Sequence, residues 1–222
     1  MNLPDSHNDD PEGVLKFDLE FIRTSLPKHP TFNTLESWRQ ILYRLGLIGR
    51  SANRYAGLAF GNVSLRTTGE QFLISGTQTG GNAKLNIDDY ASVTDFRIER
   101  NSVRAEGLTE PSSESLTHGA LYAIDTAIAC VFHVHSPEIW QAAMTDLLPL
   151  PKTSPDQLYG TPALAWAIQR AAREQPGRPI CMGGHEDGIM AYGSSPSSVG
   201  QTLVATLAEA LQAKLADRPY AD

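Results

Sequence analysis

The hydrophobic positions of the chain follow two periods, one typical of strands and one typical of helices. Within Leu58–Arg66, apolar Val63 and Leu65 alternate with polar residues, as in a half-buried strand. Further strands are predicted at Gln71–Ser75, at Ser92–Glu99 and Ser102–Glu106 as a hairpin, at Cys130–Ser136, and at Arg178–Met182. These short apolar runs, separated by turn residues, predict a sheet.

Helical spacing dominates the segments between and after these runs. The predicted helices are Asn33 to about Gly49, Ser112 or Ser113 to about Asp125, Thr161–Glu174, and a long helix after Ser195 and Pro196. In the first of them we expect Trp38, Ile41, Leu42, Leu45 and Ile48 to form a core stripe, with Gly49 as its end. Since the chain has no internal repeat or low-complexity linker, we expect an N-terminal extension, 1–30, and one domain, 31–222.

The most informative strand is Cys130–Ser136, because it carries His133 and His135 two positions apart. Alternate residues of a strand point the same way, so both imidazoles are expected on one face. The run is otherwise suited to burial, where a polar ring needs a partner. A divalent metal ion, with Zn²⁺ the first choice, would serve both rings. The alternative is two core histidines with separate hydrogen bonds.

Two other segments offer acidic and imidazole groups. Glu114 lies in the first turn of a predicted helix, where an acid suits the helix dipole, and this helix leads directly into the histidine strand. Farther along, His185 and Asp187 are also two residues apart, so an extended chain would direct both to one place. The glycine-rich segment Gly76–Gly81 is either an ordinary turn or a loop that holds an anion.

Composition narrows the function classes. The 222 residues are 41% hydrophobic and 19% charged, with a net charge of −7, which is typical of a soluble globular protein. We expect no nucleic-acid partner, because no cluster of Lys and Arg is apparent, and no membrane span, because no long apolar stretch occurs. Cys130 and Cys181 lie in apolar runs, so buried free thiols in a cytoplasmic protein are favoured over a disulfide.

In their order and spacing, these motifs resemble the class II aldolase/adducin family, which includes L-fuculose-phosphate aldolase and ribulose-phosphate 4-epimerase. The resemblance spans about Trp38 to Leu211. It is carried by Gly61–Arg66, Ser75–Gly81, Pro111–Glu114 with His118, His133–Ser136, Tyr159–Thr161, His185–Gly188 and the C-terminal helix. It implies an α/β protein with three layers, α/β/α, around a mainly antiparallel sheet, and a homotetramer with its site at a subunit interface.

The resemblance also implies residue roles. Zn²⁺, or another divalent metal, would be bound by His133, His135 and a third ligand, with Glu114 as catalytic acid/base. An ungapped match puts Asp187 in the third position, while ligand type favours His185. The substrate or its phosphate would contact Gly61, Asn62, Thr77, Ser112 and Ser113. Gln78 stands where the family's aldolases carry a glycine, which leaves the phosphate contact open.

The implied activity is that of a metal-dependent lyase. It would make or break a C–C bond in a small sugar or sugar phosphate, through a metal-stabilised ene-diolate. One alternative is an epimerase or dehydratase on the same scaffold. Another is a non-catalytic interaction domain like that of adducin, which lacks the metal histidines. A metal-dependent hydrolase is a weaker option, because the HxHxDH pattern is absent after His133.

Overall fold

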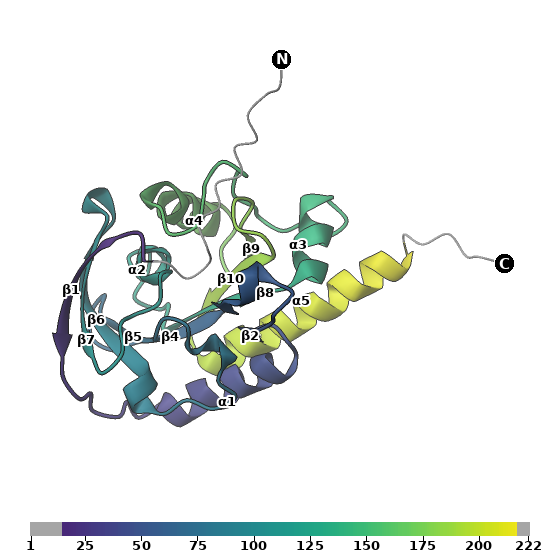
Figure 1. Cartoon of the computed structure of the whole chain (residues 1–222). Helices are drawn as coiled ribbons and strands as arrows, with labels where there is room; N and C mark the ends of the chain where they lie inside the picture. The colour runs from purple at the N-terminus through teal and green to yellow at the C-terminus, as the bar shows by residue number, and fades with distance from the viewer. Residues whose placement is uncertain (1–14, 217–222) are drawn as a thin grey trace, which may run out of the picture.

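The computed structural model describes residues 15–216, which form one large sheet between two layers of helices (Figure 1). The strands of the large sheet, in spatial order, are β1 (Asp18–Arg23), β7 (Ser102–Gly107), β6 (Tyr90–Arg97), β5 (Phe72–Ser75), β4 (Asn62–Arg66), β8 (Cys130–His135), β10 (Gly188–Gly193) and β9 (Ile180–Cys181). Only the β1–β7 pair is parallel, so the predicted mainly antiparallel α/β/α fold is confirmed. β1 lies within the predicted extension 1–30 and adds an edge strand to the sheet.

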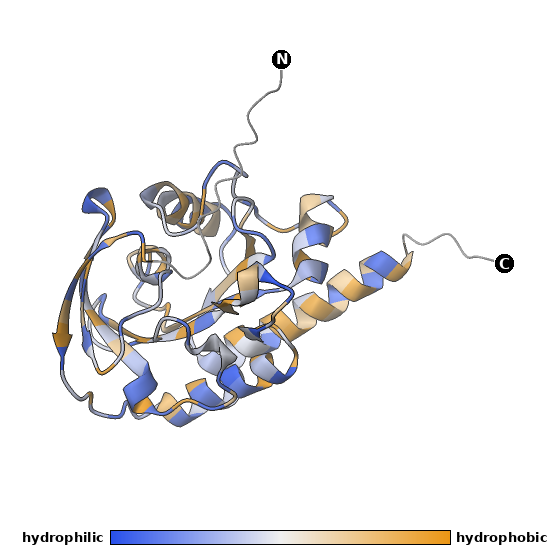
Figure 2. Cartoon of the chain, viewed as in Figure 1, coloured by the Kyte–Doolittle hydropathy of each residue, from blue (hydrophilic) through white to orange (hydrophobic). Residues whose placement is uncertain are grey.

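Five α-helices cover the two faces of the sheet within the described residues. They are α1 (Phe32–Arg44), α2 (Ser115–Tyr122), α3 (Pro137–Met144), α4 (Pro162–Glu174) and α5 (Pro196–Ala216). Helices α1, α3 and α5 share one hydrophobic cluster, whereas α2 and α4 share a second cluster on the opposite face. Figure 2 shows hydrophobic residues along most of α5, whereas α1 is more mixed. No helix among residues 15–216 has the length and apolar character that a bilayer crossing requires.

Strand β8 lies near the middle of the sheet, between β4 and β10. Its odd and even residues face different helical layers: Phe132 and Val134 belong to the α1–α3–α5 cluster, and Val131 belongs to the α2–α4 cluster. Both central histidines therefore face the α2–α4 side, as the period of two predicts. Every residue of β8 is buried.

Several predicted boundaries were wrong. Helix α1 is preceded by Thr31 rather than Asn33, and it ends before Gly46, whose φ of +71° does not continue a helix. Ile41 and Leu45 of its predicted core stripe are 39% and 46% exposed. Helix α2 ends at Tyr122 instead of Asp125.

The predicted strand Leu58–Arg66 is also divided. Gly61, with a φ of +77°, separates β4 from β3 (Ala59–Phe60), which pairs with β2 (Gly49–Arg50) in a second small sheet. Because of this break, β3 leaves the large sheet and lies next to the glycine-rich loop 76–81.

The two cysteines are free and buried, as predicted. Burial raises the pKa of the Cys130 thiol and raises that of Cys181 to about 12.

Candidate metal centre

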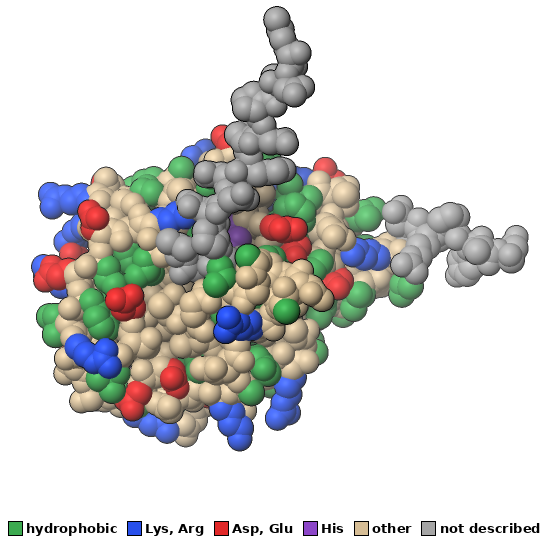
Figure 3. Space-filling model, in the orientation of Figure 1, with side chains coloured by type: hydrophobic (Ala, Val, Ile, Leu, Met, Phe, Trp, Pro, Cys, Tyr) green, Lys and Arg blue, Asp and Glu red, His purple; other side chains and the backbone are tan. Residues whose placement is uncertain are grey.

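Three histidines from two segments of the chain meet on the α2–α4 side of the sheet, at the C-terminal end of β8. His133 and His135 extend from β8, and their Nε2 atoms are 3.1 Å apart. His185 lies in the turn between β9 and β10, and its ring centroid is 4.9 Å from that of His133 and 4.8 Å from that of His135. All three residues are buried. Figure 3 shows histidine atoms at one point on this face of the molecule.

The geometry of this cluster fits a metal ion. Each histidine offers one ring nitrogen, and these atoms all lie within 4.8 Å of one another. In a tetrahedral zinc site with Zn–N distances of about 2.0–2.1 Å, ligand nitrogens are roughly 3.3 Å apart. The His133–His135 distance is close to that value, and three neutral imidazoles are a ligand set that zinc accepts. The cluster therefore could hold a divalent ion with a position left for substrate.

Asp187 takes no part in the cluster, because the chain around it is a turn and not an extended segment. Its φ is +61°, and its backbone carbonyl accepts a hydrogen bond from the Ser136 N–H at 2.8 Å. The side chain turns away to Tyr55, whose hydroxyl donates to Asp187 Oδ2 at 2.6 Å, and to Arg54 at 3.3 Å. The expectation that His185 and Asp187 would be directed to one place was wrong, since it assumed an extended backbone.

Gly188, the residue after Asp187, provides the space in which the rings meet. A Cβ at this position would lie 3.1 Å from Cγ of His185 and 3.3 Å from Cε1 of His133. Either contact is tighter than ordinary van der Waals packing, so a side chain here would press on both imidazoles. Glycine therefore suits the close approach of β10 to the cluster.

Glu114 lies beside the histidines at the start of α2. Its Oε1 is 3.5 Å from Nδ1 of His185, while its Oε2 accepts a hydrogen bond of 2.8 Å from the Thr117 hydroxyl. The carboxyl group is 2% exposed. Glu114 is itself the N-cap residue of α2, so the helix begins after the predicted start at Ser112 or Ser113. Ser112 Oγ instead accepts from the Glu114 N–H at 3.3 Å, which helps fix the approach to the helix.

The residues predicted to contact substrate surround one small cavity next to Glu114. Gly61, Asn62, Thr77, Ser112 and Ser113 all line it, together with Ala59, Gly76, Gln78, Gly80 and Glu114. Strand β4, the loop 76–81 and the segment before α2 thus converge here from distant parts of the sequence. The cavity adjoins the histidine cluster through Glu114, which lines the cavity and approaches His185 to 3.5 Å.

Sequence reasoning missed the Arg54–Tyr55 pair. The Tyr55 ring packs edge-on against His135 with centroids 4.6 Å apart, and the Arg54 guanidinium lies over the Tyr55 ring. Burial and the bond to Asp187 raise the pKa of Tyr55 well above its usual range, so the phenol stays protonated. Both residues precede β3 in a segment without recognisable periodicity, so nothing in the sequence marked them. Tyr159, which belongs to a motif that carries the family resemblance, contacts His185 with ring centroids 5.0 Å apart and ring planes tilted by 35°.

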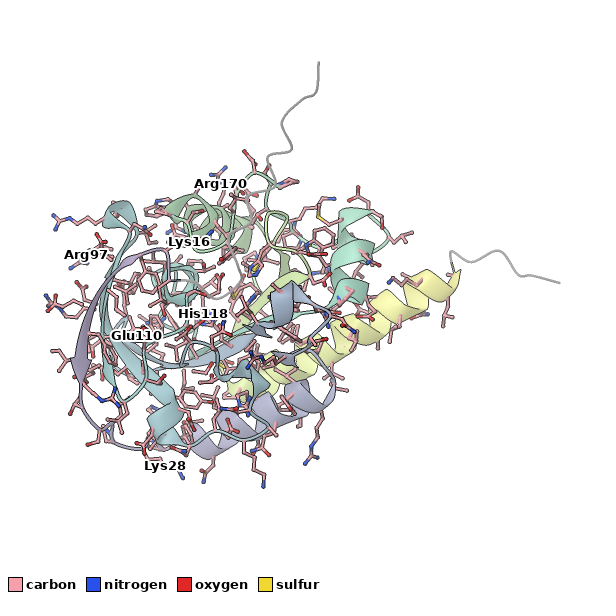
Figure 4. The ribbon with its side chains drawn as sticks, in the orientation of Figure 1. Lys16, Lys28, Arg97, Glu110, His118 and Arg170 are labelled. Carbon is pink, nitrogen blue, oxygen red and sulfur yellow. The ribbon has the colours of Figure 1, made fainter. Side chains whose placement is uncertain are left out.

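A second buried polar group lies deeper under α2. His118 points from α2 to the sheet (Figure 4), where its Nδ1 is 2.7 Å from the Ser64 hydroxyl; that hydroxyl is also 2.7 Å from the Tyr122 hydroxyl. Burial lowers the pKa of His118 to about 3, so the ring is neutral at ordinary pH. Because this group bonds to β4 and not to the cluster, His118 holds α2 against the sheet.

Comparison with solved structures shows that this fold recurs in aldolases. L-fuculose-1-phosphate aldolase from Thermus thermophilus is 19% identical, with 84% of this chain and 96% of that chain covered and a TM-score of 0.62. A sugar-phosphate aldolase from Thermotoga maritima is 13% identical, with 85% and 97% covered and a TM-score of 0.62. L-fuculose 1-phosphate aldolase from Glaciozyma antarctica is 18% identical, with 87% and 78% covered and a TM-score of 0.57.

Family membership rests on a sequence match. No curated protein shows significant similarity to the chain. Residues 50–213, however, match the family model described as the class II aldolase and adducin N-terminal domain. That range contains β3 and β4, Glu114, all three clustered histidines and most of α5. The chain therefore belongs to the class II aldolase and adducin family.

Proposed function

We propose that the protein is a metal-dependent lyase of the aldolase type, which makes or breaks a C–C bond in a small sugar-like hydroxy-carbonyl compound. The observation that carries this proposal is the convergence of His133, His135 and His185 within 4.8 Å, with the carboxyl of Glu114 beside them. The family implies a substrate of the sugar-phosphate class, and the similar structures from Thermus and Thermotoga are named as sugar-phosphate aldolases.

The three histidines would hold the metal ion, with Zn²⁺ the best match to an all-imidazole set. When bound, such an ion supplies Lewis-acid stabilisation of the negative charge that develops on substrate oxygens as the C–C bond breaks. The protein positions its ligands through two rigid elements: β8 fixes two rings by its register, and the turn before β10 fixes the third. Buried ligand rings keep water away from the reacting atoms.

Glu114 is suited to move the proton. In the cleavage direction, a base removes the proton from the hydroxyl group whose carbon becomes the new carbonyl. The electron pair of the broken C–C bond passes to the other fragment, which already carries a carbonyl group. The same group then returns a proton to carbon, so that Glu114 ends as it began. Thr117 holds Oε2, which leaves Oε1 as the oxygen that faces the cluster and handles the proton.

The substrate would extend from the histidines to the cavity lined by Asn62, Thr77, Ser112 and Ser113.

We also propose that the protein is a homotetramer with its site at a subunit interface, as the family resemblance implies. The exposed side chains of Val204, Leu211 and Leu215 along α5 are compatible with such contacts. Sedimentation analysis would measure the assembly directly, and a monomer at every concentration would rule it out.

The decisive experiment is a screen of free and phosphorylated ketoses for aldehyde release by the zinc-loaded protein, with a chelated sample as control. Aldehyde release that disappears with chelation and returns with zinc supports the lyase. A change of configuration or loss of water without cleavage would instead identify an epimerase or a dehydratase. A protein that binds no zinc would leave the non-catalytic interpretation.

A further inference from the structure

The cavity beside Glu114 is small, and its described lining carries no positive side chain. It encloses about 20 Å³, which is room for about one water molecule. Among the described residues that line it, none is Lys or Arg, and Glu114 adds a carboxylate. A phosphate dianion would therefore meet a narrow space with no neutralising cation in its lining, in a chain that already carries a net charge of −7.

Three backbone donors around this cavity are already engaged. The Ala59 N–H donates to Oε1 of Gln78 at 3.0 Å, and the Thr77 N–H donates to the Glu110 carbonyl at 3.0 Å. The Glu114 N–H is held by Ser112 Oγ. Gln78 is the residue that matters most here, because its side chain both lines the cavity and takes up the Ala59 donor.

The loop that carries Gln78 has little freedom to open. A Cβ on Gly80 would lie 2.5 Å from the Phe60 carbonyl oxygen, so the loop is pressed directly onto β3. Arg39 donates to the Asn82 carbonyl at 2.9 Å from α1 and fixes the far end of the loop. The small volume is thus built into the packing. Asn62, also on the cavity wall, presents a buried Oδ1 that has no hydrogen-bond partner among the described residues, and this acceptor suits a hydroxyl donor.

We infer that Gln78 closes the anion pocket, and that the substrate's end away from the histidines is a short, uncharged, hydroxyl-bearing group and not a phosphate. This inference rests on the proposed function and narrows its substrate to free hydroxy-carbonyl compounds. A hydroxyl can donate to Asn62 Oδ1 without the desolvation cost that a buried phosphate dianion carries.

The test is Gln78→Gly in the full-length, zinc-loaded protein. The φ of Gln78 is +58°, which glycine adopts without strain, and the substitution frees both the space and the Ala59 N–H. The probe is glycerol phosphate, titrated by calorimetry. The wild type should show no saturable binding in the millimolar range, and Gln78→Gly should bind at least about tenfold tighter, the gain expected from one charge-assisted hydrogen bond.

Asp146→Gly is the matched control, because Asp146 also has a left-handed backbone, with a φ of +61°, and lies after α3 away from the cavity. It should leave glycerol phosphate binding unchanged. Gln78→Asn is a second variant, since asparagine tolerates this φ but is too short to keep the bond to Ala59; it too should gain binding. Saturable binding by the wild type as tight as that of Gln78→Gly, or no gain in either Gln78 variant, would overturn the inference.

Turnover gives an independent comparison. For a ketose and its phosphate ester, the wild type should favour the free sugar in kcat/KM, and Gln78→Gly should shift this ratio at least about tenfold toward the ester. A wild type that favours the ester contradicts the inference. Zinc content is measured on the same samples: a protein without zinc or cleavage refutes the proposed function, while the calorimetry still decides whether the pocket is closed.

Discussion

The Tyr55 hydroxyl donates a hydrogen bond of 2.6 Å to Oδ2 of Asp187, across 132 positions of sequence. The ring of the same tyrosine packs edge-on against His135, at 4.6 Å between centroids. Tyr55 thus joins the strand that carries two of the clustered histidines to the turn that carries the third. Asp187, which stands where the family resemblance puts a metal ligand, is in this chain bonded to Tyr55 and Arg54.

We predict that Tyr55→Phe weakens zinc binding without removing a ligand. The phenyl ring can keep its contact with His135, but Asp187 loses its shortest hydrogen bond. Removing a direct hydrogen-bond partner of a metal ligand costs roughly 10–100-fold in metal affinity; Tyr55 acts one contact farther out, through Asp187, so we expect a loss of about tenfold or less. A lost bond to a charged group costs about 1.5–3 kcal/mol of stability. Chelator competition and urea unfolding measure the two effects. Tyr43→Phe, which loses only a 3.4 Å contact to the Gly81 carbonyl, is the control, and equal effects in both variants would refute the prediction.

The third ligand can be assigned by comparing His185→Ala with Asp187→Asn. Asparagine tolerates the φ of +61° at position 187 and can still accept from Tyr55, but it is a poor zinc ligand. We expect His185→Ala to lose more than the roughly 100-fold in zinc affinity that an outer-partner change costs, whereas Asp187→Asn should retain bound zinc. Metal analysis after dialysis gives the answer, and the reverse order would make Asp187 the ligand.

Glu114→Gln should remove turnover and leave zinc in place. Glutamine preserves the shape of the side chain and its contact with Thr117, but it cannot accept and return a proton. General acid–base groups contribute about 10²–10⁴-fold to rate, so kcat should fall by at least about 100-fold. The matched control is Glu110→Gln, outside the cavity lining and before α2 (Figure 4). Loss of zinc from Glu114→Gln would show that Glu114 is a ligand.

His118 should make stability depend on pH. Its pKa is about 3 in the folded protein, against about 6.5 in an unfolded chain. Below pH 6.5 the unfolded state therefore binds a proton that the folded state refuses, and stability falls as pH falls, by up to about 1.4 kcal/mol per pH unit. His118→Asn lacks this proton uptake. When the pH is lowered from 7 to 5, the variant should therefore lose less stability than the wild type. Urea unfolding at both pH values measures this, and parallel curves would show that the pKa of His118 is not depressed.

Local patterns were enough to predict several parts of the site. The period of two in Cys130–His135 placed two imidazoles on one face because side-chain direction in a strand depends only on sequence parity. Thr161 and Pro162 marked the start of α4 because capping is a property of adjacent residues. Glu114 was placed near the histidines because α2 leads directly into β8.

Tertiary structure decided everything that depends on a turn conformation or on distant partners. Whether His185 or Asp187 faces the cluster depends on the left-handed backbone at 187, which the Ser136 N–H and the Tyr55 hydroxyl support from distant parts of the chain. The bond between Gln78 and Ala59 likewise exists only because loop 76–81 packs on β3. Sequence sets the direction of a side chain within a regular element, since the backbone repeats there. In turns the backbone does not repeat, and direction is set by contacts that only the folded chain supplies.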